Sequence, residues 1–142
     1  MSTDDQVREA SAKFYAALNG MTTGDASAMA GVWSHSETVT TMHPIGGKQT
    51  GWKAVQESFD QVGGLASGGH VELLDQVISA GGDLAYETGV ESGSVTVAGE
   101  TLRLEHRVTN VYRREGGEWK IVHHHTDISP AMVAVLERLQ AA

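Results

Sequence analysis

The hydrophobic positions of the chain follow a helical period in its first half and a period of two in its second half. Before residue 65, apolar side chains recur every three or four positions, which predicts helices over about 3–20, 25–33 and 52–62. Between the second and third helices, a β-branched run over 38–42 predicts a strand that ends before Pro44. The chain therefore places its helices ahead of most of its strands.

Alternating apolar and polar positions predict four strands, over about 71–79, 83–98, 101–114 and 118–127. Short glycine-containing turns divide these strands, so consecutive strands are expected to be antiparallel neighbours. Ser129 and Pro130 then predict the cap and first turn of a last helix. Together the elements predict an α+β fold in which a strongly curved antiparallel sheet wraps around three N-terminal helices, with a short C-terminal helix.

Length and composition narrow the class of protein. The 142 residues are 40% hydrophobic, enough to bury a core, and we interpret them as a single domain over 1–142, with its core over about 5–129 and a helical extension over 130–142. The absence of cysteine excludes disulfides and thiolate metal sites. A net charge of -8 argues against binding to nucleic acid or anionic membranes. We expect a cytoplasmic protein, because neither a membrane span nor a secretory signal is visible.

Several short motifs occur in a recognisable order. They are FYAALN, GDASAMAGVWS, a strand ending in MHPIGG, the helix start GWKAVQ and the closing WKIVHHH. Their order and spacing resemble the SnoaL-like branch of the nuclear transport factor 2-like superfamily over about residues 5–129. That resemblance implies a cone-shaped domain whose open end admits a small apolar ligand, and homodimers that pair through the sheet. The superfamily includes ketosteroid isomerases, polyketide cyclases, dehydratases, epoxide hydrolases and domains that only bind or assemble.

The ketosteroid isomerases of this superfamily provide a comparison of catalytic positions. Phe14 stands at the position of their catalytic tyrosine, His43 at that of their aspartate base, and Thr109 or Asn110 at that of their neutral acid. None of these groups is kept, so we expect no efficient steroid isomerisation. His43 can still replace the base, because imidazole titrates near neutral pH. Alternatively, His43 is a hydrogen-bonded residue that shapes the turn at Pro44.

Strand 101–114 presents one face that is more apolar and one that is more charged. The even-numbered positions are the apolar ones, and we expect them to face inward, which makes His106 and Asn110 pocket residues. We therefore predict His43 as a catalytic base and Asn110 as a group that stabilises developing negative charge. The predicted ligand-binding residues are Tyr15, Trp33, Trp52, Tyr86, His106, His123 and His125.

The triple histidine at 123–125 also allows a metal site. Alternation along a strand would place His123 and His125 on one face, where they could share an ion if a third ligand converged on them. This run is, however, a routine ending among the SnoaL-like domains that the chain resembles, so we expect no metal and no cofactor.

We interpret the protein as a dimer that binds a small apolar carbonyl or aromatic compound and possesses, if it is an enzyme, isomerase, cyclase or dehydratase activity. The alternative is a non-catalytic ligand-binding or assembly module.

Overall fold

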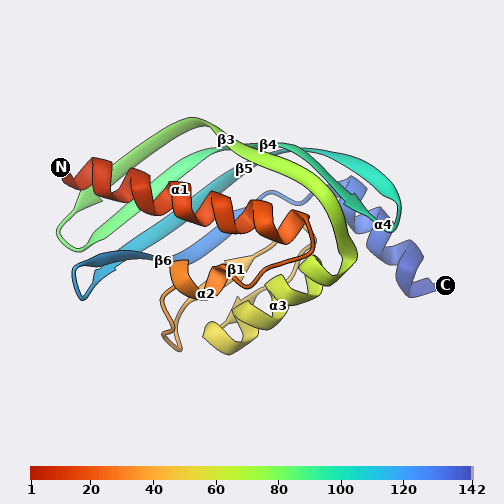
Figure 1. The fold of residues 1–142 in the computed structure, drawn as a ribbon, viewed down its shortest axis with the longest axis horizontal. Coiled ribbons are helices and arrows are strands. Elements are labelled where there is room, and N and C mark those ends of the chain that lie inside the picture. Colours follow the sequence, from red (N-terminus) through yellow and green to blue (C-terminus); the bar gives the residue numbers. More distant parts are fainter. Residues whose placement is uncertain (142) are drawn as a thin grey trace.

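The structure is a computed structural model that describes residues 1–141 (Figure 1). Its elements, in chain order, are α1 (Thr3–Thr22), α2 (Met29–Val32), β1 (Thr40–Met42), β2 (Gln49–Thr50), α3 (Trp52–Leu65), β3 (Ala66–Gly81), β4 (Leu84–Val97), β5 (Glu100–Glu115), β6 (Glu118–Thr126) and α4 (Pro130–Ala141). The predicted α+β fold is confirmed. No helix within these residues is both long enough and apolar enough to cross a membrane.

The strands form one sheet with the order β2-β1-β6-β5-β4-β3. The meander from β3 to β6 is antiparallel throughout, as its short turns predict. By contrast, β1 pairs in parallel with β6, with Thr41 opposite His124. The expectation of a purely antiparallel sheet is therefore wrong at this pair. The two strands are parallel because a long connection, α3 with the meander, carries the chain from one to the other.

Three N-terminal helices cover the inner face of the sheet. Figure 1 shows α1 running across the bent sheet, α2 and α3 beside it, and α4 at one end. The buried side of α1 includes Phe14 and Leu18, and that of α3 includes Phe59. The ring of Trp33 lies 6.4 Å from that of Phe14 and 5.8 Å from that of Phe59, which joins the helices in one core. Burial of these apolar side chains stabilises the wrapped arrangement.

The first helix begins where the sequence predicts, and the third ends later. Ser2 caps α1, since its hydroxyl accepts the N–H of Asp5 at 3.1 Å. By contrast, α3 continues past its predicted end at about residue 62 to Leu65. A Cβ at Gly63 would lie 3.5 Å from the Cβ of Ala26, an ordinary contact distance, so α3 packs here against the segment after α1.

The free edge of the sheet at β3 is tied to α1. The side-chain oxygen of Asn19 accepts the N–H of Val71 at 2.7 Å, and its nitrogen donates to the carbonyl of Val71 at 2.9 Å. Asn19 thus supplies both hydrogen bonds that a neighbouring strand would supply at this residue. This contact holds the C-terminal half of α1 over the inner face of the sheet.

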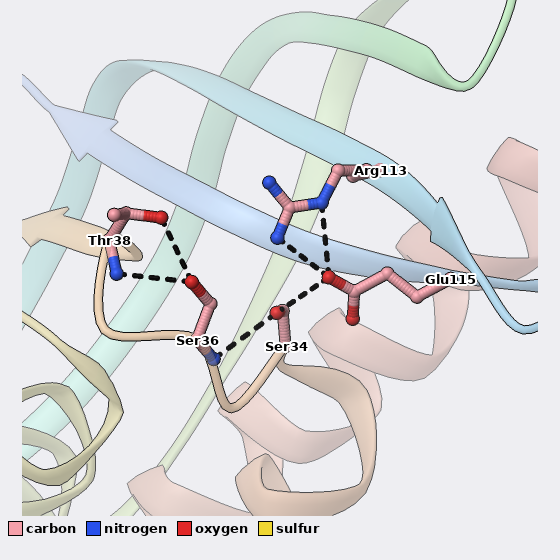
Figure 2. Close-up of polar contacts among 5 residues, drawn as sticks. All are labelled: Ser34, Ser36, Thr38, Arg113 and Glu115. Carbon is pink, nitrogen blue, oxygen red and sulfur yellow. Dashed lines mark hydrogen bonds and ion pairs between the residues drawn. The ribbon is translucent and has the colours of Figure 1, made fainter.

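The connection from α2 to β1 is held by hydroxyl groups. Figure 2 shows the hydroxyl of Ser34 donating to Glu115 at the end of β5, over 2.9 Å, while Arg113 donates to the same carboxylate oxygen. Farther along, the N–H of Ser36 reaches the Ser34 oxygen, and the N–H of Thr38 reaches the Ser36 oxygen. These bonds fix the path by which the chain enters β1 and so the position of His43 directly after it.

Candidate functional site

The polar interior of the domain surrounds a small cavity between α1, α3 and the inner face of β4, β5 and β6. This inner cavity has a volume of about 50 Å³. Its polar side chains are Thr22, Glu91 and the imidazoles of His43, His106 and His124, and the rest of its wall is apolar. A second, outer cavity of about 230 Å³ adjoins it, with His43 and Met132 lining both. Because α4 supplies Met132 and Val135 to the outer cavity, this helix closes the end of the cone.

The strongest polar pair in the inner cavity is His106 with Glu91. These residues lie opposite each other on β5 and β4, and Nε2 of His106 lies 2.7 Å from Oε1 of Glu91. Both side chains are buried, and Nδ1 of His106 has no hydrogen-bond partner. A carboxylate accepts hydrogen bonds, so it holds the proton on Nε2 and leaves a lone pair on Nδ1.

A second imidazole, His124, is oriented through Asn110. Nδ1 of His124 donates to Oδ1 of Asn110 at 2.7 Å. The amide nitrogen of Asn110 donates to Glu87 at 2.9 Å and to the hydroxyl of Tyr15 at 3.0 Å. Tyr15 in turn donates to Oε2 of Glu91 at 2.9 Å. One continuous hydrogen-bond network therefore joins all three strands of the cavity floor.

The third imidazole, His43, is held by Ser58 of α3. Nε2 of His43 lies 2.8 Å from Oγ of Ser58, whose own hydrogen is directed to the carbonyl of Val55 at 2.7 Å. Ser58 therefore accepts, and His43 donates. The ring of His43 also packs edge-on against Phe59, with centroids 4.7 Å apart.

Burial determines the charge of these groups. It lowers the pKa of His43 to about 3, with a contribution from neighbouring His124, and it lowers the pKa of His124 to about 4. Burial alone would raise the pKa of Glu91, but its hydrogen bonds from His106 and Tyr15 and the nearby imidazoles hold that pKa below its ordinary value. Burial also raises the pKa of Tyr15, so its hydroxyl keeps its proton. Near neutral pH, the cavity holds a carboxylate beside two uncharged imidazoles.

Glu87, a second buried carboxylate, lies behind this floor. It accepts from Tyr112 at 2.8 Å and from Gln76 at 2.6 Å, in addition to Asn110. The pairing of β3 with β4 is irregular next to Gln76, where Asp75 has a positive φ. At this irregularity the side chain of Gln76 points inward. Three donors offset the cost of burying the carboxylate of Glu87.

The structure brings four of the predicted site residues together. His43 and His106 line the inner cavity, and Tyr15 and Asn110 belong to the network beneath it. The predicted inward face of β5 is confirmed, since Leu104, His106, Val108, Asn110 and Tyr112 are all buried. Asn110, however, has both amide hydrogens bonded within the protein, so the prediction that it stabilises charge on a substrate directly is wrong. Its carbonyl oxygen instead accepts from His124.

Two predicted tryptophans lie outside both cavities. Trp33 is buried in the aromatic core, and Trp52 is half-buried with its ring stacked on that of His35 at 4.6 Å. The expectation that these indoles grip a ligand is corrected by their positions, because their rings face other aromatic side chains. The wall of the inner cavity is formed by aliphatic side chains and Phe59 instead.

Three further predicted residues lie on the outer face of the sheet. Tyr86 is 49% exposed, His125 is exposed, and His123 is half-buried with Nδ1 2.6 Å from the hydroxyl of Thr40. Their assignment to the pocket is wrong. Val111 of β5 pairs with His123 and Tyr112 pairs with Ile121, so β6 has one extra residue between these pairs. This β-bulge reverses which side chains of β6 face inward after Ile121, and His124 faces inward in place of its two neighbours.

The functional residues that pattern reasoning missed are Glu91, His124 and Ser58. Glu91 lies on the same face of β4 as the buried Val95 and Val97, and this alternation was the only indication in the sequence that its side chain points inward.

Among residues 1–141, no three histidine, aspartate or glutamate side chains are placed so that they could hold a metal ion. The arrangement places imidazoles beside a carboxylate in an apolar wall, and such groups are the usual acids and bases of proton transfer.

The fold and this cavity define a member of a known family of small domains. Residues 7–132 match the SnoaL-like domain family, and the chain therefore belongs to that family, within the nuclear transport factor 2-like superfamily. No curated protein matches the chain.

Solved structures of the same fold differ in what is said of their function. A proposed dehydratase from Streptomyces avermitilis is 23% identical, with a TM-score of 0.76 over 89% of this chain and 95% of its own. A proposed aromatic ring hydroxylase from Novosphingobium aromaticivorans is 20% identical, with a TM-score of 0.73 over 87% and 86%. A proposed association domain of calcium/calmodulin-dependent protein kinase type II from Thiobacillus denitrificans is 28% identical, with a TM-score of 0.69 over 86% and 94%. The first two likenesses show the fold alone.

Proposed function

We propose that the protein binds a small, largely apolar carbonyl or aromatic compound across the adjoining inner and outer cavities and transfers a proton on it without a cofactor. One observation carries this proposal: Nδ1 of His106 is buried in the cavity wall without a partner while Glu91 holds the opposite ring nitrogen. An imidazole held in this way keeps a lone pair that can take a proton, and its carboxylate partner stabilises the imidazolium after the proton arrives. Isomerisation, cyclisation and dehydration all need such a group.

His43 is the second candidate for the proton acceptor, as its position after β1 suggests. Its held nitrogen faces the neutral hydroxyl of Ser58 rather than a carboxylate, and burial lowers its pKa to about 3. A proton on His43 would therefore be poorly stabilised. This contrast favours His106 as the base and gives His43 the role of positioning the bound molecule from the opposite side.

The proposal can be tested with 5-nitrobenzisoxazole, a compact aromatic compound whose ring opens when a base removes one carbon-bound proton. We expect the protein to accelerate ring opening, measured as absorbance of the phenolate product. His106→Gln keeps a polar side chain but cannot take the proton, so it should lose about 100-fold in rate. His125→Gln, on the outer face, is the matched control. Equal rates for both variants would rule out His106 as the base.

Assembly is the second candidate function. It is supported by the likeness to a kinase association domain and by exposed apolar side chains on the outer face of β3 and β4, including Leu74, Val77, Leu84 and Tyr86. These residues would suit pairing with a second copy of the chain through the sheet. Such pairing is compatible with a ligand in the cavity, because the cavity lies on the inner side of the sheet and none of these exposed residues lines it.

A further inference from the structure

The inner and outer cavities differ in size, and each fits a different part of a molecule. A cavity of about 150 Å³ holds a benzene-sized ring, and a water molecule, which is similar in size to a methyl group, takes up about 30 Å³. The outer cavity, of about 230 Å³, is therefore large enough for one six-membered ring. The inner cavity, of about 50 Å³, is too small for a ring and holds one or two methyl-sized groups.

The boundary between the two cavities is mostly apolar. The side chains that line both cavities are those of His43, Ile45, Val62 and Met132. The one polar member, His43, directs its Nε2 hydrogen to Ser58. Any part of a molecule that passes from the outer cavity into the inner one loses its hydration at this boundary, and only an apolar part does so at little cost.

The sheet supplies separate aliphatic side chains to each cavity. Val95 of β4 and Leu104 of β5 line the inner cavity and not the outer one. Val97 and Leu102, on the same two strands, line the outer cavity and not the inner one. Val97 follows Val95 on the same face of β4, about 7 Å farther along the strand. A ligand that fills both cavities therefore lies along these strands, with one end against each pair.

The two cavities also differ in what they offer to a ligand oxygen. In the inner cavity, Glu91 already receives a hydrogen bond on each oxygen, and Nδ1 of His106 is enclosed by the protein. The outer cavity is lined by the exposed amides of Gln61 and Gln140, and an amide both donates and accepts hydrogen bonds. A carbonyl oxygen can thus find a donor in the outer cavity, whereas in the inner one it would be buried without a partner.

We infer that the two cavities select a single six-membered ring that carries one short, unbranched alkyl arm. The arm occupies the inner cavity, and the ring lies in the outer cavity with its carbonyl oxygen towards the glutamine amides. The arm has one or two carbons, because about 50 Å³ holds no more. Val95 limits its length, since this side chain lines the inner cavity alone. This inference rests on the proposed function and names the shape and orientation of its substrate.

The test titrates a series of ketones into the unaltered protein while backbone amide signals are followed by NMR. The series is cyclohexanone with its 4-methyl, 4-ethyl, 4-propyl and 4-tert-butyl derivatives. Each carbon that enters the inner cavity should lower Kd about fourfold, so 4-ethylcyclohexanone should bind about 15-fold more tightly than cyclohexanone. The propyl and tert-butyl derivatives should bind less tightly than the ethyl derivative although they carry more carbons, because their arms do not fit.

A Kd that keeps falling from the ethyl to the propyl and tert-butyl derivatives would overturn the inference, because the arm would then lie in open space. An equal Kd for cyclohexanone and its methyl and ethyl derivatives would also overturn it. Failure of every ketone to bind would overturn it together with the ligand of the proposed function. Binding is measured here without turnover, so a protein that follows the expected series and transfers no proton overturns the proposed function alone.

A matched pair of variants locates the selectivity. Val95→Ile adds one methylene to the inner cavity, and Val97→Ile adds one to the outer cavity, at two buried positions of the same strand. Val95→Ile should reduce the preference for the ethyl derivative over cyclohexanone from about 15-fold to about fourfold or less, whereas Val97→Ile should keep it. An unchanged preference in Val95→Ile would place the arm elsewhere and overturn the inference. The ketone series on the unaltered protein decides the question even where a variant fails to fold.

Discussion

His106 donates from Nε2 to Glu91 over 2.7 Å and keeps Nδ1 unpartnered inside the domain. The two residues are opposite each other in the register of β5 and β4, so the rigid sheet fixes their distance. A buried acceptor without a partner costs about 1–3 kcal/mol. An imidazole that keeps a lone pair opposite a carboxylate has the arrangement that a general base requires.

Acid should destabilise the fold well before ordinary carboxylates are protonated. The pKa values of His43 and His124 fall from 6.5 in the unfolded chain to about 3 and about 4 in the folded one. Below 6.5 the unfolded state therefore binds protons that the folded state does not. Each histidine makes its full contribution to the free energy of unfolding above that pH. Below it, the contribution declines by about 1.4 kcal/mol for each pH unit by which the pH falls.

Urea denaturation between about pH 7 and pH 5 measures this decline. His124→Gln should reduce it by about half, because His43 still contributes, while His125→Gln, which removes an exposed imidazole, should leave it unchanged. A free energy of unfolding that stays constant over this range would show that the imidazoles are solvated rather than buried.

Asn19 should contribute to stability through the edge of β3. Asn19→Ala leaves both the N–H and the carbonyl of Val71 without their partners, so we expect a loss of about 1–3 kcal/mol in the free energy of unfolding. Lys13→Ala, at an exposed position of the same helix, is the control and should change stability little. Equal effects of the two substitutions would mean that water replaces Asn19 at the strand edge.

The outer face of the sheet should hold two copies of the chain together. Light scattering at micromolar concentration is expected to give the mass of a dimer. Tyr86→Glu places a charge among exposed apolar side chains and should shift the mass towards a monomer, whereas Ala12→Glu on the exposed side of α1 should not. A monomer mass for the unaltered protein would contradict pairing through the sheet.

Zinc or nickel near equimolar concentration should leave the melting temperature unchanged. His123 and His125 lie with ring centroids 5.9 Å apart on the outer face, and within residues 1–141 no third ligand joins them. Metal bound to the native state would raise the melting temperature by mass action. A rise of several degrees that is lost in the double variant His123→Ala, His125→Ala would reverse this expectation.

The sequence predicts most of the fold because apolar spacing and turn residues act locally. The meander from β3 to β6 and the capped start of α4 follow from alternation, from glycine turns and from Ser129 with Pro130. The short strand β2 and the parallel pairing of β1 with β6 do not, because they depend on contacts between segments distant in the chain.

The site is less predictable than the fold for two physical reasons. Alternation from Trp119 and Ile121 would direct His123 and His125 inward, but the bulge in β6 reverses the phase and selects His124. On β4, Leu84 and Tyr86 are outside while Glu87 and Glu91 are inside, against their hydrophobicity, because donors from α1, β3 and β5 satisfy both carboxylates. Neither the bulge nor these donors is visible in a local pattern.

The most direct test of the central claim is the nitrogen-15 NMR signal of the His106 ring at about pH 8, assigned by comparison with His106→Gln. The account predicts one nitrogen bearing hydrogen, Nε2, and one without, Nδ1. Two hydrogen-bearing nitrogens, or hydrogen on Nδ1 alone, would contradict it, because His106 would then have no lone pair opposite Glu91 to take a proton.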